Sequence, residues 1–400
     1  MDLEHIYAVM SLIAGIVFFY TLIAKRIENS GISGPIVYVI VGLLLGEYGF
    51  AIIGESLEMN QLRLFVDLTL ALILFSDAAQ SNLTVLKQKA MYPVRMLLLG
   101  LPGAIVLGTL FAVVLLDVLS LVEAAILATM LAATDAALGK AVISNPKVPA
   151  PVSEGLNVES GLNDGMCVPI LLLLIAIATS STDSQLTTSH ALMVFAEELG
   201  IGMVVGLSLA YIGAKLLQWS ASKDWLSEVW SQLTVGAIAL SSFGLAQTLH
   251  GSGYIAAFTG GLLFGHLASR HKHKLVLTTE SMAELLAMLT WILFGAAVIG
   301  QVIGLFSANM IVYALISLTL VRMLPIYLSF LGTSVPKGHR LFMGWFGPRG
   351  LASIVFTIIV LDADLPGGQF IALTVTCTVI LSLVLHGITA RPLAERIGKD

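Results

Sequence analysis

The stretch Asn157–Gly165, NVESGLNDG, carries polar side chains inside an apolar run: Glu159, Ser160, Asn163 and Asp164. Successive residues of an α-helix are rotated by about 100°, so Ser160, Asn163 and Asp164 share one arc. Glu159 points about 140° away from Asp164 on the same wheel. The arc offers a hydroxyl, an amide carbonyl and a carboxylate, a hard oxygen set that suits a small hydrated cation. Glu159 instead faces a neighbouring helix, where a buried acid needs a cationic partner.

Other charged residues also fall within apolar runs: Asp67, Asp77, Asp135, Arg322 and Arg349. A charge at the centre of a bilayer costs roughly 2.5–3.5 kcal/mol on insertion scales, so several of them indicate function or structural ion pairing. Asp67 lies near the start of its run and is expected at the interface.

The composition requires a membrane protein. The chain has 400 residues, of which 57% are hydrophobic and 11% are charged, and its mean hydropathy is +0.95. Soluble domains carry about 25% charged residues. The apolar runs are continuous, which predicts an all-α polytopic protein and excludes the alternating pattern of a β-barrel. Cys167 and Cys377 lie in apolar runs and form no disulfide or metal framework. Nothing in the sequence calls for a cofactor or a nucleic-acid partner.

Thirteen apolar segments are predicted, joined by short connections into a single integral membrane domain over residues 1–400. Their expected spans are 6–23, 35–53, 62–80, 93–116, 121–141, 154–178, 191–217, 229–249, 253–268, 281–305, 308–331, 340–361 and 368–389.

The positive charges test this count. With the N-terminus outside and strict alternation, 17 of the 20 Lys and Arg residues fall on the cytoplasmic side, Arg63 falls on the other side, and Arg322 and Arg349 lie within segments. Cytoplasmic loops are enriched in Lys and Arg, so the pattern supports a multi-pass protein of the cell membrane with its N-terminus outside and its C-terminus in the cytoplasm.

Thirteen segments fit two inverted six-helix units, 1–178 and 229–391, joined by a linker helix at 191–217. The fifth and twelfth segments then occupy matching places, and both look interrupted. The fifth contains AATDAALGK, with Thr134 and Asp135 in its middle, and the twelfth contains FGPRGLAS around Arg349. Interrupted helices at matching places indicate an ion site near the membrane midplane.

The sequence also suggests partners for these charges. Unwinding at Thr134 and Asp135 would offer free backbone carbonyls as well as both side chains to a cation, so Asp135 is expected to face the ion, and Arg349 could offset the carbonyl-rich helix ends. Asp77 is expected to approach the same cavity from the third segment. Either Arg322 or Arg349 could pair with Glu159.

A carboxylate in this setting binds a proton or a cation, but not both well. That competition is sufficient for exchange by alternating access. Because Asn163 is a neutral neighbour of Asp164, one proton for each monovalent cation is the simplest expectation. Ligand types do not separate the alkali cations. Sodium is the first expectation, and lithium and potassium remain open.

Four motifs, ATDAALG, VESGLNDG, VRMLPIY and GPRGLAS, occur in this order along the chain. Together they resemble the monovalent cation:proton antiporters of the NhaP/NHE type, and the resemblance spans nearly the whole chain. It implies an NhaA-like fold with crossed, unwound helices 5 and 12, a homodimer in the lipid bilayer, and a role in sodium transport and pH homeostasis. It implies a cation and proton site at Asp164, with Ser160, Thr134 and Asn163 nearby, and a pairing of Glu159 with Arg322.

The chain differs from the family pattern at two places. Members often have a proline where this chain has Ala136, and a Phe-Glu pair followed by glycines where it has Phe75-Ser76-Asp77-Ala78. The side chain of Asp77 is one methylene shorter than glutamate and need not reach the ion.

Other function classes fit less well. An intramembrane enzyme would need a motif such as H-E-x-x-H or a serine with a histidine base, and neither is found beside Ser160. A passive cation channel uses rings of carbonyls or charges from symmetric subunits, whereas these acids lie on asymmetric, interrupted helices. Another ion-coupled transporter is the remaining alternative.

Overall fold

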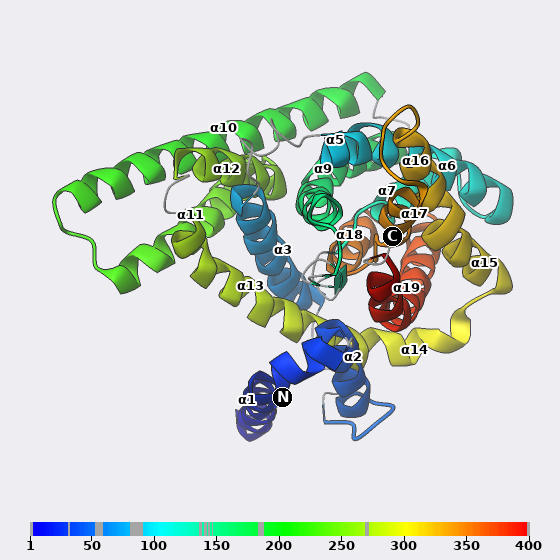
Figure 1. Cartoon of the computed structure of the whole chain (residues 1–400), viewed down its shortest axis with the longest axis horizontal. Coiled ribbons are helices and arrows are strands. Elements are labelled where there is room, and N and C mark those ends of the chain that lie inside the picture. Colours follow the sequence, from blue (N-terminus) through cyan, green and yellow to red (C-terminus); the bar gives the residue numbers. More distant parts are fainter. Residues whose placement is uncertain are drawn as a thin grey trace.

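The computed structural model describes residues 3–30, 33–52, 59–80, 91–135, 138–139, 142, 145, 147–182, 188–268 and 272–397. Every regular element in these ranges is a helix (Figure 1). A bilayer offers no water to backbone N–H and C=O groups, so an apolar spanning segment must satisfy them internally, as a helix does. The predicted all-α class is confirmed.

The first half of the described chain contains α1 (Leu3–Ser30), α2 (Gly34–Leu45), α3 (Met59–Gln80), α5 (Met91–Arg95), the π-helical η1 (Met96–Gly100), α6 (Leu101–Leu115), α7 (Leu121–Met130), α9 (Ala150–Thr182) and α10 (Thr188–Ser222). The second half contains α11 (Glu228–Thr248), α12 (Gly253–Leu267), α13 (Lys272–Phe294), η2 (Gly295–Ile299), α14 (Gly300–Val302), η3 (Ile303–Leu305), α15 (Ala308–Ile316), η4 (Ser317–Val321), α16 (Arg322–Ser329), α17 (Lys337–Trp345), α18 (Leu351–Asp362) and α19 (Gly368–Ile397). Among the described residues, eight helical runs are long and apolar enough to cross a membrane, and α2, α7, α12 and α18 are shorter apolar helices.

Some helix ends differ from the predicted spans. The segment expected over 35–53 is helical only to Leu45, because the chain turns at Gly46 and Ala51 takes a positive φ of 50°. The segment expected to end at 389 continues to Ile397. Its last turns are not uniformly apolar, but Ala394 and Ile397 are buried in a cluster with Val152 of α9. Tertiary packing extends this helix beyond its apolar run.

Two helices are interrupted where the sequence predicts breaks. After α7 ends at Met130, residues 131–135 are not helical, and Ala136 lies outside the described residues. Between Trp345 at the end of α17 and Leu351 at the start of α18, residues 346–350 are not helical. We call these segments the first break (131–135) and the second break (346–350).

The helices form two groups around the breaks (Figure 1). In one group, α3, α10, α11, α12 and α13 pack against one another. In the other, α7, α9, α18 and α19 pack together with α6, α15 and α16 alongside. Glycine allows the closest contact in the first group: a Cβ at Gly265 of α12 would overlap the backbone carbonyl of Ala79 on α3. Small residues at such crossings let membrane helices approach closely.

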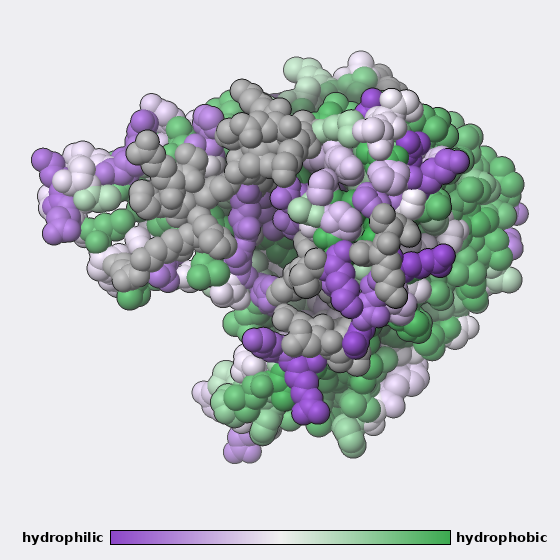
Figure 2. All heavy atoms as spheres, in the orientation of Figure 1, coloured by the Kyte–Doolittle hydropathy of each residue, from purple (hydrophilic) through white to green (hydrophobic). Residues whose placement is uncertain are grey.

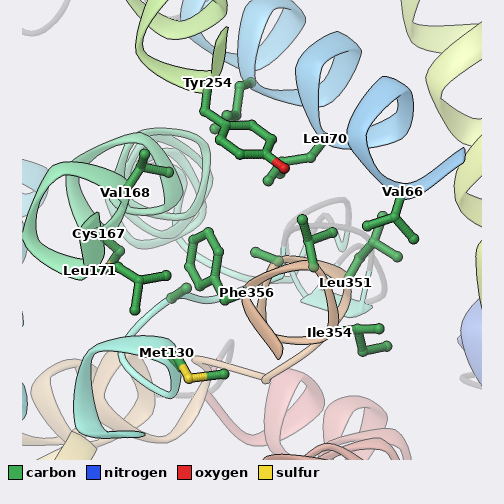
Figure 3. Packing of buried hydrophobic residues seen from close by; sticks show 14 of the residues in the cluster. Val66, Leu70, Met130, Cys167, Val168, Leu171, Tyr254, Leu351, Ile354 and Phe356 are labelled. Carbon is green, nitrogen blue, oxygen red and sulfur yellow. The ribbon is translucent and has the colours of Figure 1, made fainter. Parts of the chain in front are cut away.

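The hydrophobic core lies where the two groups meet (Figure 3). Side chains of α3, α7, α9, α12 and α18 converge there, among them Leu70, Met130, Val168, Tyr254 and Phe356. The outer face is also apolar. Figure 2 shows hydrophobic side chains over the side where α6 and α15 lie, and Val114 of α6 is 78% exposed. An apolar outer surface of this kind fits contact with lipid.

Candidate functional site

The two breaks cross each other beside α9. The backbone N–H of Asp135 in the first break donates to the carbonyl of Pro348 in the second, at 2.8 Å. An interrupted helix leaves N–H and C=O groups without helical partners, so each break exposes polar backbone in the interior. The crossing satisfies one such pair directly.

A charged side chain from each break caps a helix end of the other. Arg349 is 0% exposed, and its Nη1 donates to the carbonyls of Ala132 and Ala133 at 3.1 and 3.2 Å, just beyond the C-terminus of α7. The carboxylate of Asp135 accepts from the backbone N–H of Leu351, the first residue of α18, at 2.8 Å. A cation at a helix C-terminus and an anion at an N-terminus are each favoured by the helix dipole. The two charges thus offset the two exposed helix ends.

Asp135 has a second backbone bond, because its Oδ1 accepts from the N–H of Leu138 at 3.1 Å. Both carboxylate oxygens are therefore engaged. Gly350 leaves room for this carboxylate, since a Cβ there would overlap it. In this geometry Asp135 acts as a helix cap, which differs from the expectation that it faces an ion.

The polar arc of α9 holds Thr134 of the first break. The hydroxyl of Ser160 donates to the Thr134 carbonyl at 2.8 Å. Asn163 is 0% exposed, and its Nδ2 donates to Thr134 Oγ1 at 2.6 Å while its Oδ1 accepts from the Thr134 N–H at 3.4 Å. Both ends of the amide are engaged, and an ionised aspartate could not donate in its place. Of the three residues expected to face an ion together, Ser160, Asn163 and Asp164, Asn163 has its amide engaged by Thr134 instead.

Asp164 differs from these residues in its hydrogen bonding. It is 8% exposed, and its Oδ1 is the one carboxylate oxygen in the described ranges that is buried without a hydrogen-bond partner. Asp77 of α3 lies nearby. A Cβ built at Gly161, one helical turn before Asp164, would be 3.3 Å from the Cβ of Asp77. The structure therefore brings two acids from different helices to the same side of α9.

Glu159 pairs with Arg322, one of the two arginines that the sequence leaves open. Arg322 Nη1 and Nη2 donate to Glu159 Oε1 and Oε2 at 2.6 and 2.9 Å, and each residue is 1% exposed. Arg322 begins α16 after the π-helical η4 and packs on the second break, where a Cβ at Gly347 would overlap its guanidinium. The bidentate pair joins α9 to α16 beneath the crossing.

A small cavity lies at the crossing. Thr134 and Asp135 of the first break, Phe346 and Pro348 of the second, and Glu159 and Ser160 of α9 contribute to its lining. Asp164 lies one helical turn beyond Ser160. The atoms here that can coordinate a cation are carbonyl, hydroxyl and carboxylate oxygens, which suit a hard cation. Across the described ranges, no group of three His, Cys, Asp or Glu side chains is placed to hold a metal ion.

Asp67, expected near the interface, lies apart from the crossing. Its Oδ1 accepts from the Tyr254 hydroxyl at 2.5 Å, and its Oδ2 is 3.7 Å from Arg63 Nε. Arg63 also pairs with Asp362 at the end of α18. This cluster joins α3, α12 and α18.

Sequence reasoning missed Ser382 and His386 of α19. Both are buried; Ser382 bonds Arg349 of the second break, and His386 bonds Trp345 at the end of α17, next to the break. Their spacing of four residues, which puts them on one helix face, is the signal that could have found them.

Comparisons with known proteins bear on the whole chain. The family described as sodium/hydrogen exchanger, transmembrane, matches residues 12–396. The K⁺/H⁺ antiporter NhaP2 of Shewanella sp. strain ANA-3 is 24% identical over 406 residues, which cover 100% of this chain and 68% of the relative. The Na⁺/H⁺ antiporter NhaG of Bacillus atrophaeus is 26% identical over 412 residues, covering 100% of this chain and 76% of the relative.

The K⁺/H⁺ antiporter NhaP of Alkalimonas amylolytica is 25% identical over 391 residues, covering 96% of this chain and 66% of the relative. The chain thus spans about two thirds of the length of several curated relatives. Among solved structures, the sodium proton antiporter MjNhaP1 from Methanocaldococcus jannaschii superposes with a TM-score of 0.78 at 20% identity, covering 96% of this chain and 99% of that one. This likeness shows that the fold is shared.

Proposed function

The chain belongs to the family of transmembrane sodium/hydrogen exchangers, and from this membership we propose that it exchanges one monovalent cation for one H⁺ across a membrane. The observation that carries the proposal is Asp164, a buried carboxylate with one oxygen that has no hydrogen-bond partner in the described part of the chain. An uncompensated charge in a membrane interior is costly, and either a bound proton or a bound cation relieves it. Asp164 is therefore assigned as the site for which the two compete.

The cation ligands come from the crossing. Asp164 supplies the charge, and the Thr134 carbonyl and the Ser160 hydroxyl supply neutral oxygens. Asp77 is assigned as an auxiliary carboxylate because it packs on α9 within one turn of Asp164. Asp135 and Asn163 belong to the wall of the site, since Asp135 caps α18 and Asn163 bonds the Thr134 hydroxyl.

One-for-one exchange follows from the remaining charges. Glu159 is neutralised by Arg322, and Asp135 is engaged with the helix end of α18. Asn163 is neutral in every state. We propose that Asp77 keeps one protonation state throughout the cycle. With Asp164 alone changing its proton and cation occupancy, each cycle moves one charge in each direction and no net charge.

The proposed architecture is that of an alternating-access transporter with thirteen helices. Two inverted six-helix units over 1–178 and 229–391 are joined by a linker helix at 191–217, and the protein is a homodimer. The protein spans the cell membrane, with its N-terminus outside the cell and its C-terminus in the cytoplasm. Support comes from the two breaks. Arg349 of the second break caps the end of α7, and Asp135 of the first break caps the start of α18.

Cation identity is the least constrained part of the proposal. Relatives are named for K⁺ in some cases and for Na⁺ in others. Sodium, lithium and potassium all accept the same oxygen ligands, and cavity size and ligand number decide between them. We propose Na⁺ as the first candidate and K⁺ as its main competitor.

The test is transport by the purified protein in vesicles. A pH-sensitive dye inside the vesicles would report proton movement when Na⁺, Li⁺ or K⁺ is added outside, with a voltage-sensitive dye run in parallel. We expect at least one cation to move protons without changing the voltage. Asp164→Asn should abolish this movement while the protein inserts and purifies normally.

Three outcomes would contradict the proposal. A cation current that collapses the membrane voltage would indicate a channel. Exchange by wild-type protein that creates a voltage would contradict one-for-one stoichiometry. Normal exchange by Asp164→Asn would exclude Asp164 as the carrier.

A further inference from the structure

Two buried side chains of α19 face the second break. Ser382 is 0% exposed and His386 is 3% exposed, and they lie one helical turn apart. We propose that Ser382 and His386 are positioning residues that hold the second break in register and thereby set the apparent cation affinity at Asp164. This inference rests on the proposed exchange function.

The two side chains hold both ends of the break. The backbone N–H of Arg349 donates to Ser382 Oγ at 2.7 Å, and His386 Nε2 lies 2.9 Å from the carbonyl oxygen of Trp345. His386 Nδ1 lies 3.1 Å from Ser382 Oγ. Trp345 is the last residue of α17, and Arg349 lies two residues before α18. We call Ser382 and His386, with their contacts to Arg349 and Trp345, the bridge. The bridge spans the whole interruption between α17 and α18.

Both ring nitrogens of His386 have polar neighbours. A carbonyl oxygen only accepts, so the hydrogen bond between Nε2 and the Trp345 carbonyl requires a proton on Nε2. Nδ1 lies 3.0 Å from the Ser382 carbonyl oxygen and 3.1 Å from Ser382 Oγ, so a group that can accept and a group that can donate both lie beside it. The Ser382 oxygen in turn accepts from Arg349. A change at Ser382 removes the acceptor of the buried Arg349 N–H, and a change at His386 removes one of two hydrogen bonds to the Trp345 carbonyl, which also accepts from the Gly347 N–H at 2.9 Å.

The bridge also leads to the ion site through one residue. The backbone of Arg349 is held by Ser382, and its guanidinium binds the carbonyls of Ala132 and Ala133. The next residue of the first break is Thr134, whose carbonyl is a proposed cation ligand. A shift of the Arg349 backbone therefore moves the groups that hold Thr134. Contiguous packing of this kind is the physical route by which one site influences another.

A purely structural role predicts a different result. If the bridge only stabilises the fold, its loss lowers the amount and thermal stability of the protein but leaves the cation affinity of the folded fraction unchanged. The apparent KM for the cation, compared with the maximal rate and the melting temperature, separates the two roles.

Three substitutions at His386 vary the hydrogen-bond donor that faces the Trp345 carbonyl. The amide nitrogen of His386→Gln can reach the position of Nε2 and donate to Trp345. The shorter His386→Asn reaches only the position of Nδ1, and His386→Leu is apolar. Ser382→Ala removes the acceptor for Arg349. Thr378→Val is the matched control, because Thr378 is equally buried on α19, one turn before Ser382, and its hydroxyl donates to the Thr374 carbonyl of the same helix.

All variants would be purified and compared in vesicles for apparent KM, maximal rate and melting temperature. We expect His386→Leu, His386→Asn and Ser382→Ala to raise the apparent KM about tenfold, the scale of one lost buried hydrogen bond. His386→Gln should stay within about threefold of wild type, which marks rescue by a restored donor, and Thr378→Val should keep the wild-type KM.

The proposal is overturned if His386→Leu and Ser382→Ala have the wild-type KM, or if His386→Asn and His386→Gln behave alike. It is also overturned if the variants are recovered in low amount but their folded fraction keeps the wild-type KM. Exchange by wild type and by Thr378→Val shows that the proposed function stands whatever the bridge variants do. Absence of exchange in wild type would instead refute the function itself.

Discussion

The buried pair of Glu159 and Arg322 gives the sharpest prediction about stability. The side chains are 1% and 2% exposed and share two hydrogen bonds of 2.6 and 2.9 Å. Removing one partner of such a pair leaves an uncompensated charge and typically costs about 3–5 kcal/mol. Since about 1.4 kcal/mol corresponds to a factor of ten, Glu159→Ala should lower the folded-to-unfolded ratio by about two to three and a half orders of magnitude.

The two single substitutions should not be equal. Arginine remains protonated in proteins, so Arg322 keeps its charge when Glu159 is removed. A glutamate can bind a proton and become neutral, so Glu159 loses its charge when Arg322→Met removes the partner. We therefore expect Glu159→Ala to destabilise more than Arg322→Met. Replacing both, as in Glu159→Leu with Arg322→Met, leaves no buried charge and should recover most of the loss.

The assay is a double-mutant cycle of Glu159→Leu, Arg322→Met and the double variant, with Glu159→Ala measured beside it, on the purified protein in detergent. Unfolding would be followed by loss of the monodisperse peak on size exclusion after heating, and by titration with a denaturing detergent. Vesicle transport of the same samples gives the apparent KM for the cation. Because Glu159 is neutralised in place, its removal should change KM less than it changes stability.

Two results would refute this reasoning. If the double variant is as unstable as Glu159→Ala, uncompensated charge is not the cause of the loss. If Glu159→Ala melts like wild type but shifts the apparent KM more than tenfold, Glu159 takes part in ion binding and its structural assignment is wrong.

Three further predictions concern other parts of the molecule. Asp135→Ala removes the cap of α18 and should cost about 0.5–2 kcal/mol in a denaturation titration, whereas a wild-type midpoint would argue against the cap. Gly265→Ala should lower the melting temperature because the new methyl group overlaps the Ala79 carbonyl, while Gly244→Ala, with open space around it, should not; equal effects would contradict the contact. Protons and cations compete at Asp164, so the apparent cation KM should rise about tenfold per pH unit on the acidic side at constant maximal rate. A KM independent of pH would exclude competition.

Much of the helix order could be predicted from the sequence, because apolar runs in a membrane have one main way to satisfy their backbone. The second break could also be predicted, since Gly347, Pro348 and Gly350 disfavour a continuous helix. Helix ends were less predictable. The C-terminal extension of α19 depends on burial of Ala394 and Ile397 against α9, and no local pattern encodes that contact.

The site could be predicted only as a list of residues. A helical wheel gives the direction of Asn163 relative to Asp164, but it does not say which neighbour lies there. In the structure Thr134 of the first break lies there, and it forms hydrogen bonds with both ends of the Asn163 amide. Glu123 illustrates the same limit. It is a buried acid that sequence reasoning did not single out, and it is satisfied by Ser120 in a capping box and by the N–H of Gly367.

The pairing of charges is what distinguishes Asp164. Arg322 neutralises Glu159, Asp135 caps α18, and Arg349 caps the end of α7. Each of these charges has a partner that stays in place while the site is empty. Among the described residues, Asp164 has a buried oxygen without one, and a bound proton or cation would supply it. A transporter needs such a group, because a ligand that is satisfied without its substrate has little free energy to gain by binding it.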